Sequence, residues 1–379
     1  MGSVPVIKLL HIADVHLGKT FRMLGRKGAI QRKTQQATFE RAIGLALEHR
    51  VHAVLLAGDL FDTPKPSDTL VRSVVQQLRR LDAASIVTFL VAGNHDLGPD
   101  GRVGAVAGLE DAGSGLRLIG QDTEVHRFEE LDLTVIARSA TPAASHSPLS
   151  GWPIGRTTRY AVGVAHGSTY RSGQVEDPHA IHPREIRELG LDYLALGDWH
   201  SAFEAHPAPT VAWYAGAPEW LAFDQPGSGH VLLVEISAPG EAKVMPLPVG
   251  RRRSLRQEYN AAEVDEAALR TALKAAADPE LVCEVMLTGL MPLHRAINVD
   301  ALEEDFGDAF FRLRITNRAR IWLDKSALEA IPAQTVLGRF VRLMSERITQ
   351  ASENDQSILE EALQVGAAVL AGRADEVLG

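Results

Sequence analysis

Short apolar runs in the first part of the chain repeatedly end in a small polar cluster that contains glycine. Runs of this length that are rich in Val, Ile, Leu and Ala are typical of buried β-strands. We predict strands at Val6–Ala13, Ala53–Ala57, Ile86–Ala92, Tyr160–Ala165 and Tyr193–Leu196. Amphipathic helices are predicted at Thr38–Arg50 and Asp68–Arg80. Strands that alternate with helices predict an α/β domain whose sheets are largely buried.

The pattern changes after a further predicted strand, Val231–Ile236. Pro239, Pro246 and Pro248 follow it, and then comes the basic run Arg251–Arg253. We therefore place a domain boundary at residue 250 and predict three parts, 1–250, 251–332 and 333–379. The second part alternates helix and strand and is predicted to be a small α/β domain, at Val264–Ala277, Leu281–Leu287, Val299–Phe306 and Phe310–Ile315. The third part consists of two predicted helices, Gln334–Gln350 and Gln356–Ala371.

The composition is that of a globular protein with a large core. The chain has 379 residues, of which 45% are hydrophobic, and its single cysteine excludes an internal disulfide. No apolar run approaches the ~18 residues of a membrane span, and residues 1–12 lack the charged and apolar regions of a signal peptide. These features predict a cytoplasmic protein without membrane contact. The net charge of −9 counts weakly against nucleic acid as a partner, because acidic metal ligands lower the formal charge without repelling phosphate once ions are bound.

Polar clusters directly follow three of the predicted strands, at Asp14-Val15-His16, Gly58-Asp59 and Gly93-Asn94-His95-Asp96. A single Asp-x-His pair is weak support for a site, because the pattern also occurs at Asp177/His179 and Asp198/His200. Together the three clusters are stronger support for a metal site, because their spacings suit successive strand–helix units. Oxygen and imidazole ligands together suit Mn, Fe or Zn. The two oxygens of one carboxylate can bridge two ions, and two ions ~3.5–4 Å apart clamp a phosphate and activate a water.

The ordered series of motifs resembles the calcineurin-like metallophosphoesterase superfamily. The series is Asp14-x-His16, Gly58-Asp-Leu-Phe-Asp62, Gly93-Asn-His-Asp96, His166 and Gly197-x-x-His200. The flanking residues are similar to those of the SbcD-type DNA exonuclease subunits, over His11–Gly18, Ala57–Thr63, Val91–Asp96, Asp192–Gly197, Tyr214–Pro218 and Leu221–Asp224. The resemblance covers residues 6–240 and is more specific for the superfamily than for its nuclease branch.

The resemblance implies a fold and a set of site residues. The fold is an α/β two-sheet sandwich flanked by helices, followed by a small α/β capping domain and terminal helices. One ion is expected at Asp14, His16, Asp59 and His200, and the other at Asp59, Asn94, His166 and Asp198. His95 is expected to protonate the leaving oxygen and to be oriented by Asp96, with Asp62 supporting the metal ligands.

Position 198 departs from the pattern of the superfamily. The motif there is Gly-His-x-His, whereas this chain has Gly197-Asp198-Trp199-His200. Aspartate is an acceptable ligand for a hard ion, so we expect Asp198 to keep the coordinating role. The change adds negative charge beside the phosphate site and is expected to alter the metal preference or the rate.

Further expectations follow from the resemblance. The cofactors are two divalent ions, for which Mn²⁺ is expected and Fe²⁺, Zn²⁺ or Mg²⁺ are alternatives. The partners are DNA, a second copy of the chain in a homodimer, and an SMC-like ATPase of the SbcC type. The C-terminal helices are expected to dock on the ATPase through Phe340, Leu343 and Met344, although such helices more often pack against each other or their own domain.

A basic segment follows the first predicted metal loop. Residues 17–39 contain no acidic residue, and we predict that they form a basic arm that holds a phosphate backbone through Arg22, Arg26, Lys27, Arg32 and Lys33. The alternative is a solvated loop. The run Arg251–Arg253 is equally consistent with DNA contact and with a charged linker.

The predicted function is hydrolysis of DNA phosphodiester bonds, by in-line attack of a hydroxide held between two metal ions, in DNA repair. Two alternatives stay open at this point. A small-molecule phosphodiesterase or phosphatase would use the same site, and the basic arm and capping domain argue against it. A non-catalytic scaffold would explain the change at Asp198, but every other ligand is present.

Overall fold

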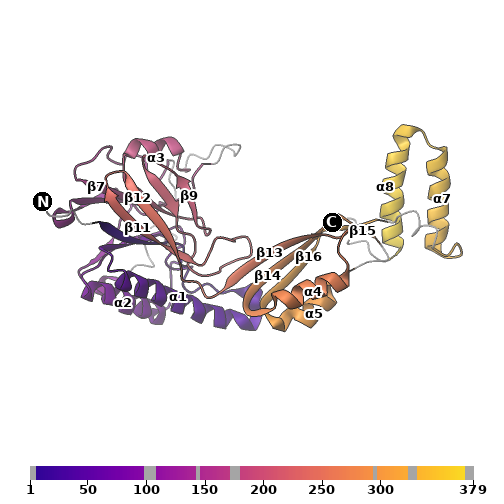
Figure 1. The fold of residues 1–379 in the computed structure, drawn as a ribbon, viewed down its shortest axis with the longest axis horizontal. Coiled ribbons are helices and arrows are strands. Elements are labelled where there is room, and N and C mark those ends of the chain that lie inside the picture. Colours follow the sequence, from indigo (N-terminus) through magenta and orange to yellow (C-terminus); the bar gives the residue numbers. More distant parts are fainter. Residues whose placement is uncertain are drawn as a thin grey trace. The chain divides into compact units, whose positions relative to one another are not determined.

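The computed structural model describes residues 6–97, 108–141, 146–170, 180–292, 297–322 and 331–371 (Figure 1). The chain divides into two compact units, Met1–Arg253 and Ser254–Gly379. The three-part division at residues 250 and 332 stays a prediction.

The first unit contains two mixed sheets of six strands each. The strands of the first sheet, in spatial order, are β12 (Glu241–Pro248), β11 (His230–Ala238), β1 (Ile7–Ile12), β2 (Ala53–Ala57), β3 (Val87–Val91) and β4 (Leu116–Leu118). Those of the second are β5 (Glu124–Phe128), β6 (Leu133–Ala137), β7 (Tyr160–His166), β8 (Tyr193–Gly197), β10 (Val211–Tyr214) and β9 (Phe203–His206). Strands β1 to β4 are parallel, as are β6, β7, β8 and β10.

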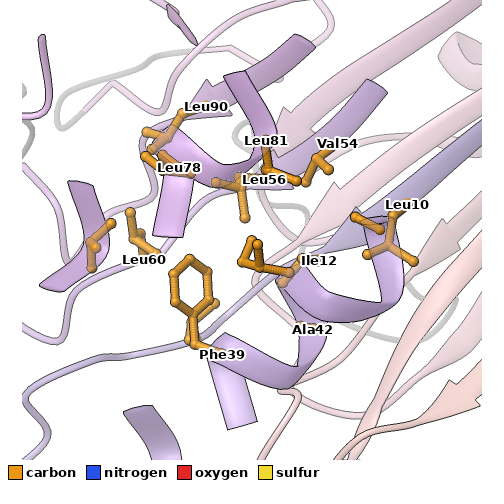
Figure 2. Close-up of a cluster of buried hydrophobic side chains, with 14 of the residues drawn as sticks. Leu10, Ile12, Phe39, Ala42, Val54, Leu56, Leu60, Leu78, Leu81 and Leu90 are labelled. Atoms are coloured by element: carbon orange, nitrogen blue, oxygen red, sulfur yellow. The ribbon is translucent and has the colours of Figure 1, made fainter. Parts of the chain in front are cut away.

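Helices cover the outer face of each sheet (Figure 1). They are α1 (Gly28–Glu48), α2 (Asp68–Ala83) and α3 (Pro183–Leu189), with 3-10 helices at Arg22–Lys27, Glu110–Ala112 and Glu129–Leu131. Alternate residues of β1 to β3 face α1 and α2, where Leu10, Val54 and Leu56 pack against Phe39 and Leu78 (Figure 2). The other residues of these strands face the second sheet and form the central core between the sheets. Helix α3 covers the far face of the second sheet. The predicted sandwich flanked by helices is therefore confirmed.

Helix α1 begins ten residues before the predicted start at Thr38. The first half of its buried face is polar, which is why the apolar pattern did not reveal it. Gln31 donates to the carbonyl of Trp220 at 3.0 Å, and Gln35 donates to the carbonyl of Val15 at 2.8 Å. The predicted basic arm over residues 17–39 is mostly helical, and its contact with a phosphate backbone stays a prediction.

The proline-containing tract after β11 is the edge strand β12 of the first sheet. Pro246 and Pro248 are tolerated because an edge strand needs hydrogen bonds on one side only. The basic run beyond it is partly internal. Arg252 is buried and its Nε donates to Gln31 at 3.0 Å, while the Glu219 carboxylate accepts the backbone N–H groups of Arg251 and Arg252. Arg252 thus anchors the end of the first unit, and a DNA contact through this side chain is excluded.

The second unit contains a three-stranded sheet in the order β13 (Arg253–Asn260), β14 (Asp278–Thr288) and β16 (Phe310–Asn317). Its core includes Leu269 of α4 (Glu266–Ala276) and Leu302 of α5 (Val299–Phe306), and a 3-10 helix lies at Gly307–Ala309. A separate pair of short strands consists of β15 (Leu290–Pro292) and β17 (Arg320–Trp322).

The last described helices, α7 (Val336–Gln350) and α8 (Glu353–Leu370), pack against each other through a small apolar core. Met344 and Phe340 belong to this core, and Phe340 packs against Gly366. Met344 is buried and therefore not available as a docking anchor, Phe340 is half-buried, and Leu343 is exposed. In the part of the chain that the structure describes, no helix has both the length and the hydropathy for a membrane span.

Candidate metal centre

The loops after β1, β2 and β3 of the first sheet meet those after β7 and β8 of the second. Parallel strands place their carboxyl ends at one edge of a sheet, where α/β proteins commonly bind ligands. Asp14, His16 and Asp59 have positive φ angles of 52°, 49° and 51°, which an L-residue adopts rarely. Such backbone conformations cluster at functional sites because the surrounding structure must hold them in place.

Backbone hydrogen bonds lock these loops together. The N–H of Asp14 donates to the carbonyl of Gly58 at 3.1 Å, and that of His16 donates to the carbonyl of Asp59 at 2.9 Å. Glycine is required at two close approaches. A Cβ at Gly58 would lie 2.1 Å from His166 Nδ1, and a Cβ at Gly93 would lie 2.2 Å from Asp59 Oδ1.

One group of possible ligands consists of Asp14, His16, Asp59 and His200, whose ligand atoms lie within 4.8 Å of one another. The Nε2 atoms of His16 and His200 are 3.1 Å apart, and Asp59 Oδ2 lies 3.4 Å from His16 Nε2. Asp14 Oδ2 is buried and has no hydrogen-bond partner among the described residues. A buried carboxylate oxygen is costly without a partner, so its presence beside two facing imidazoles suits a bound cation.

A second group surrounds His166. Its Nε2 lies 2.9 Å from Asn94 Oδ1, 3.6 Å from Asp59 Oδ2 and 3.7 Å from Asp198 Oδ1. Ligands bound to one ion at ~2.0–2.2 Å are themselves separated by about 3 to 3.5 Å, so these distances are close to those of a coordination shell. Asp59 Oδ2 adjoins both groups, as a bridging carboxylate would.

The electrostatics of the centre favour positive charge. Burial alone would lower the pKa of His166, but the carboxylates of Asp59, Asp14 and Asp198 raise it to about 9. Burial raises the pKa of Asp14 well above its usual value, and the charge of Asp59 adds to this effect. A divalent ion would neutralise the carboxylates and displace the proton from the imidazole. The donor set of carboxylates, amide and imidazoles therefore fits two divalent ions.

Neighbouring groups orient each of the three histidines with Nε2 toward the centre. His166 Nδ1 donates to the carbonyl of Ala57 at 3.0 Å, and His16 Nδ1 lies 3.1 Å from Asp62 Oδ1. Burial raises the pKa of Asp62, but the hydrogen bond from His16 and the nearby charge of Lys19 outweigh it and lower the pKa overall. Asp62 therefore stays an acceptor, which agrees with the supporting role expected for it.

His200 is oriented by Gln225, which the sequence did not single out. The Gln225 amide lies 2.5 Å from His200 Nδ1, and its Oε1 is buried without a hydrogen-bond partner among the described residues. Rotation of the amide would place Oε1 as the acceptor of the Nδ1–H and leave Nε2 free for an ion. Burial and the adjacent His16 lower the pKa of His200 to about 4, so the ring is neutral at pH 7. Gln225 directly follows the predicted motif that ends at Asp224, but no spacing rule links it to His200.

His95 lies at the exposed rim of the centre. Its ring centroid is 4.7 Å from that of His16 in an edge-to-face arrangement, and its backbone N–H donates to Asp59 Oδ1 at 2.9 Å. His95 Nδ1 lies 3.3 Å from the carbonyl of Asp62, and the residue is exposed. His95, His16 and Asp62 also form a group with ligand-like spacing.

Asp96 has a different place from the one expected. Its carboxylate accepts the backbone N–H groups of Leu60, Phe61 and Gly93, at 3.2, 2.9 and 3.0 Å. Asp96 therefore joins the loops after β2 and β3, and the hydrogen bonds that orient His95 come from Asp59 and Asp62 instead. Burial and the charge of Asp59 raise the pKa of Asp96 to about 6.

Asp198 occupies an unusual conformation with a φ of 110°. Its backbone N–H donates to Asp14 Oδ1 at 2.9 Å, which ties the second sheet to the first metal loop. Ser168 Oγ donates to Oδ2, and Oδ1 faces His166. The other Asp-x-His pair of the sequence, Asp177/His179, lies outside the described residues.

The predicted DNA-binding residues lie on two helices. Arg22, Arg26 and Lys27 belong to the 3-10 helix Arg22–Lys27, and Arg32 and Lys33 belong to α1. Arg22, Arg26 and Lys33 are exposed, whereas Arg32 donates to the carbonyl of Thr20 at 2.9 Å. The five residues therefore do not form one uniformly free basic surface.

A two-sheet sandwich with aspartate, asparagine and histidine side chains at its strand ends defines a metallophosphoesterase. The family model described as calcineurin-like phosphoesterase matches residues 7–223, and the chain belongs to that family.

Three relatives are informative about the branch. The chain is 41% identical over 273 residues to the DNA double-strand break repair protein Mre11 of Aeropyrum pernix, covering 67% of this chain and 63% of the relative. It is 26% identical over 228 residues to Mre11 of Thermoplasma acidophilum, covering 55% and 56%. It is 26% identical over 271 residues to SbcD of the Bacillus subtilis nuclease SbcCD, covering 62% and 67%. The matches thus span between about half and two thirds of these relatives.

Proposed function

We propose that this protein is a metal-dependent DNA exonuclease that hydrolyses phosphodiester bonds in DNA repair. The single observation on which the proposal depends is the position of Asp59 Oδ2. This atom lies 3.4 Å from His16 Nε2 and 3.6 Å from His166 Nε2, so one carboxylate oxygen adjoins two sets of ligands. Asp14 and His200 complete one set, and Asn94 and Asp198 complete the other. Two divalent ions in these sets would neutralise the scissile phosphate and activate a water for in-line attack.

Residues around the metal ligands perform the remaining steps. Asp62, Ala57 and Gln225 hold the three histidine ligands in one tautomer, so that no reorganisation is needed when substrate binds. His95 is the proton donor for the leaving oxygen. Its Nδ1 lies 3.3 Å from the carbonyl of Asp62, and Nε2 is the nitrogen assigned to the proton transfer.

DNA is proposed as the substrate on two grounds. The relatives with printed functions are a nuclease and double-strand break repair proteins. The exposed side chains of Arg22, Arg26 and Lys33 supply positive charge on the helices that follow the first metal loop. A homodimer and an SMC-like ATPase partner are proposed from the same likeness.

A nuclease assay tests the substrate. Labelled duplex and single-stranded DNA are incubated with the protein and Mn²⁺, Mg²⁺, Fe²⁺ or Zn²⁺, beside a chromogenic phosphodiester. We expect shortening of labelled DNA strands in at least one metal, with Mn²⁺ the most active. Cleavage of the chromogenic ester without cleavage of DNA would instead support a small-molecule phosphodiesterase. Stoichiometric metal binding without hydrolysis of any substrate would support a scaffold.

The partner is tested on the α7–α8 hairpin. Leu343 and Ile358 are exposed, so they are free to contact a coiled coil, whereas Phe340 is half-buried against α8. Leu343→Glu with Ile358→Glu should abolish co-purification with an SbcC-type ATPase and leave metal-dependent hydrolysis intact. The control is Arg342→Glu, which changes the charge of the hairpin without removing an apolar side chain. Unchanged association in the double variant would contradict this docking surface.

A further inference from the structure

The two sets of ligands differ in chemistry. The set of Asp14, His16, Asp59 and His200 offers two imidazole nitrogens and two carboxylate oxygens. The set around His166 offers one imidazole nitrogen, against oxygens from Asp59, Asn94 and Asp198. Imidazole suits Zn²⁺ and Fe²⁺, whereas carboxylate, carbonyl and water suit Mg²⁺ and Mn²⁺. The second set therefore has the larger share of hard oxygen ligands.

The contact with Ser168 explains how Asp198 can act as a ligand in the set around His166. Its Oγ donates to Asp198 Oδ2, so one carboxylate oxygen is engaged and the other, Oδ1, is directed to His166 Nε2 at 3.7 Å. The backbone of Asp198 is held independently by Asp14 Oδ1 at 2.9 Å. A ligand that is fixed at both its backbone and its second oxygen presents a single oxygen to an ion.

Solvent access differs in the same direction. In the first set Asp14 and His16 are buried and His200 is partly exposed. In the second set His166 is buried, but the side chain of Asp198 is 30% exposed and Asn94 is exposed as well. Mg²⁺ and Mn²⁺ demand six ligands and usually retain waters, because Mg²⁺ in particular loses its hydration shell reluctantly. The open side of the second set leaves room for such waters.

We infer that the centre is chemically asymmetric: Asp198, held by Ser168, makes the His166 position selective for a hard ion such as Mn²⁺ or Mg²⁺, while the His16–His200 position accepts Zn²⁺ or Fe²⁺. This inference rests on the proposed two-ion centre. It predicts that the two positions differ in which metal they bind when both kinds are present. Metal content measures this difference, so the test does not depend on hydrolytic activity.

Competitive metal uptake by the full chain tests the inference. Wild type is dialysed against a fixed excess of MnCl₂ with increasing ZnCl₂, because zinc binds nitrogen and oxygen ligands more tightly than manganese in general. Bound metal is measured by mass spectrometry, with electron paramagnetic resonance of the bound Mn²⁺. We expect zinc to replace one manganese per chain at a much lower zinc concentration than the other, so that an intermediate with one zinc and one manganese accumulates. Asp198→His gives the second position two imidazoles and should take up a second zinc, with bound manganese falling about fivefold or more. Asp198→Asn retains an oxygen ligand, so its second ion should bind more weakly and remain manganese.

Ser168→Ala tests the positioning residue, and Ser237→Ala is its matched control. Ser237 Oγ donates to the exposed Glu241 carboxylate at 3.1 Å, so the control removes the same kind of hydrogen bond elsewhere. Ser168→Ala should weaken binding of the second Mn²⁺ about tenfold and leave the first ion unchanged, while the control changes neither.

The outcomes are distinguishable. Replacement of both manganese ions at the same zinc concentration in wild type, or an unchanged metal ratio in Asp198→His, would overturn the selectivity. Equal effects of the two serine variants would overturn the role of Ser168. Failure of wild type to bind two ions even in saturating Mn²⁺ alone would instead contradict the proposed two-ion centre, and this inference with it.

Discussion

The edge of the first sheet and the edge of the second contribute to the metal centre in different ways. The first sheet supplies Asp14, His16 and Asp59, which are buried and lie in loops joined by backbone hydrogen bonds. The second supplies His166, which is buried and held by the carbonyl of Ala57, together with Asp198 and His200. These last two are partly exposed and are held by the side chains of Ser168 and Gln225. Backbone bonds between loops do not depend on which side chains are present, whereas side-chain partners change with a single substitution.

This difference explains where the chain departs from its family. The departure falls at Asp198, on the edge whose ligands are held by side chains, and the interlocked edge retains every expected ligand. A substitution at the first edge would disturb loops that share hydrogen bonds, such as those joined by Asp96. We therefore expect the first edge to determine whether the centre forms, and the second edge to tune which ion it holds.

The largest effect is expected from Asp59→Ala. Its Oδ2 adjoins both sets of ligands, and its Oδ1 accepts the N–H of His95. The variant should lose both ions and fall to background hydrolysis, whereas Asp198→Ala should lose one ion only. Metal content per folded chain distinguishes them, with circular dichroism as the control for folding. Loss of a single ion in Asp59→Ala would show that the carboxylate does not bridge.

His95→Ala should lower turnover by about 10²–10⁴-fold, the usual contribution of a general acid, while both ions remain bound. The residue lies at the rim and is assigned proton transfer, not ligation. Single-turnover hydrolysis and metal content are measured on the same preparation. Loss of an ion in this variant would move His95 into the ligand set, which its spacing to His16 and Asp62 permits.

Gln225→Leu should weaken binding of the ion at the His16–His200 position by about 10–100-fold, because His200 loses the group that fixes its tautomer. Gln225→Glu supplies an acceptor for the same Nδ1–H and should restore binding. Dissociation constants for Mn²⁺ are obtained by titration calorimetry. If glutamate and leucine have equal effects, Gln225 fills space beside His200 and does not orient it.

The smallest effect is expected outside the centre. Neutralising Arg22, Arg26 and Lys33 to glutamine should flatten the dependence of DNA affinity on salt, by about 0.9 log units of slope for each phosphate that the protein no longer neutralises. Arg184→Gln on α3 is the control, since this exposed side chain pairs with Glu188 on the adjacent turn of its own helix. An unchanged slope in the triple variant, measured between 50 and 200 mM salt (roughly the range over which such contacts weaken), would assign these residues to a solvated face.

Much of the fold followed from local patterns. The apolar runs at β1, β2, β3, β7 and β8 were long enough to predict, because both faces of these strands are buried. The first half of α1 was missed because its buried positions carry polar side chains or glycine. Gln31, Gln35 and Thr38 hydrogen-bond to other loops instead of packing in an apolar core. Edge strands such as β5 and β12 were missed because one of their faces is exposed and their apolar pattern is weak.

The sequence by itself determined the order of the motifs and the chemical identity of the ligands, since each motif directly follows a strand that its own composition predicts. Only the tertiary structure decided which groups meet. Ser168 reaches Asp198 across 30 residues, Gln225 reaches His200 across 25, and Asp96 reaches Phe61 across 35. Pairs that meet through the packing of two sheets follow no helical or strand period, so no pattern along the chain could reveal them. Asp198 shows this most clearly. The sequence reveals that an aspartate replaces the histidine of the family motif, and only the fold brings Ser168 to the carboxylate and directs its other oxygen toward His166.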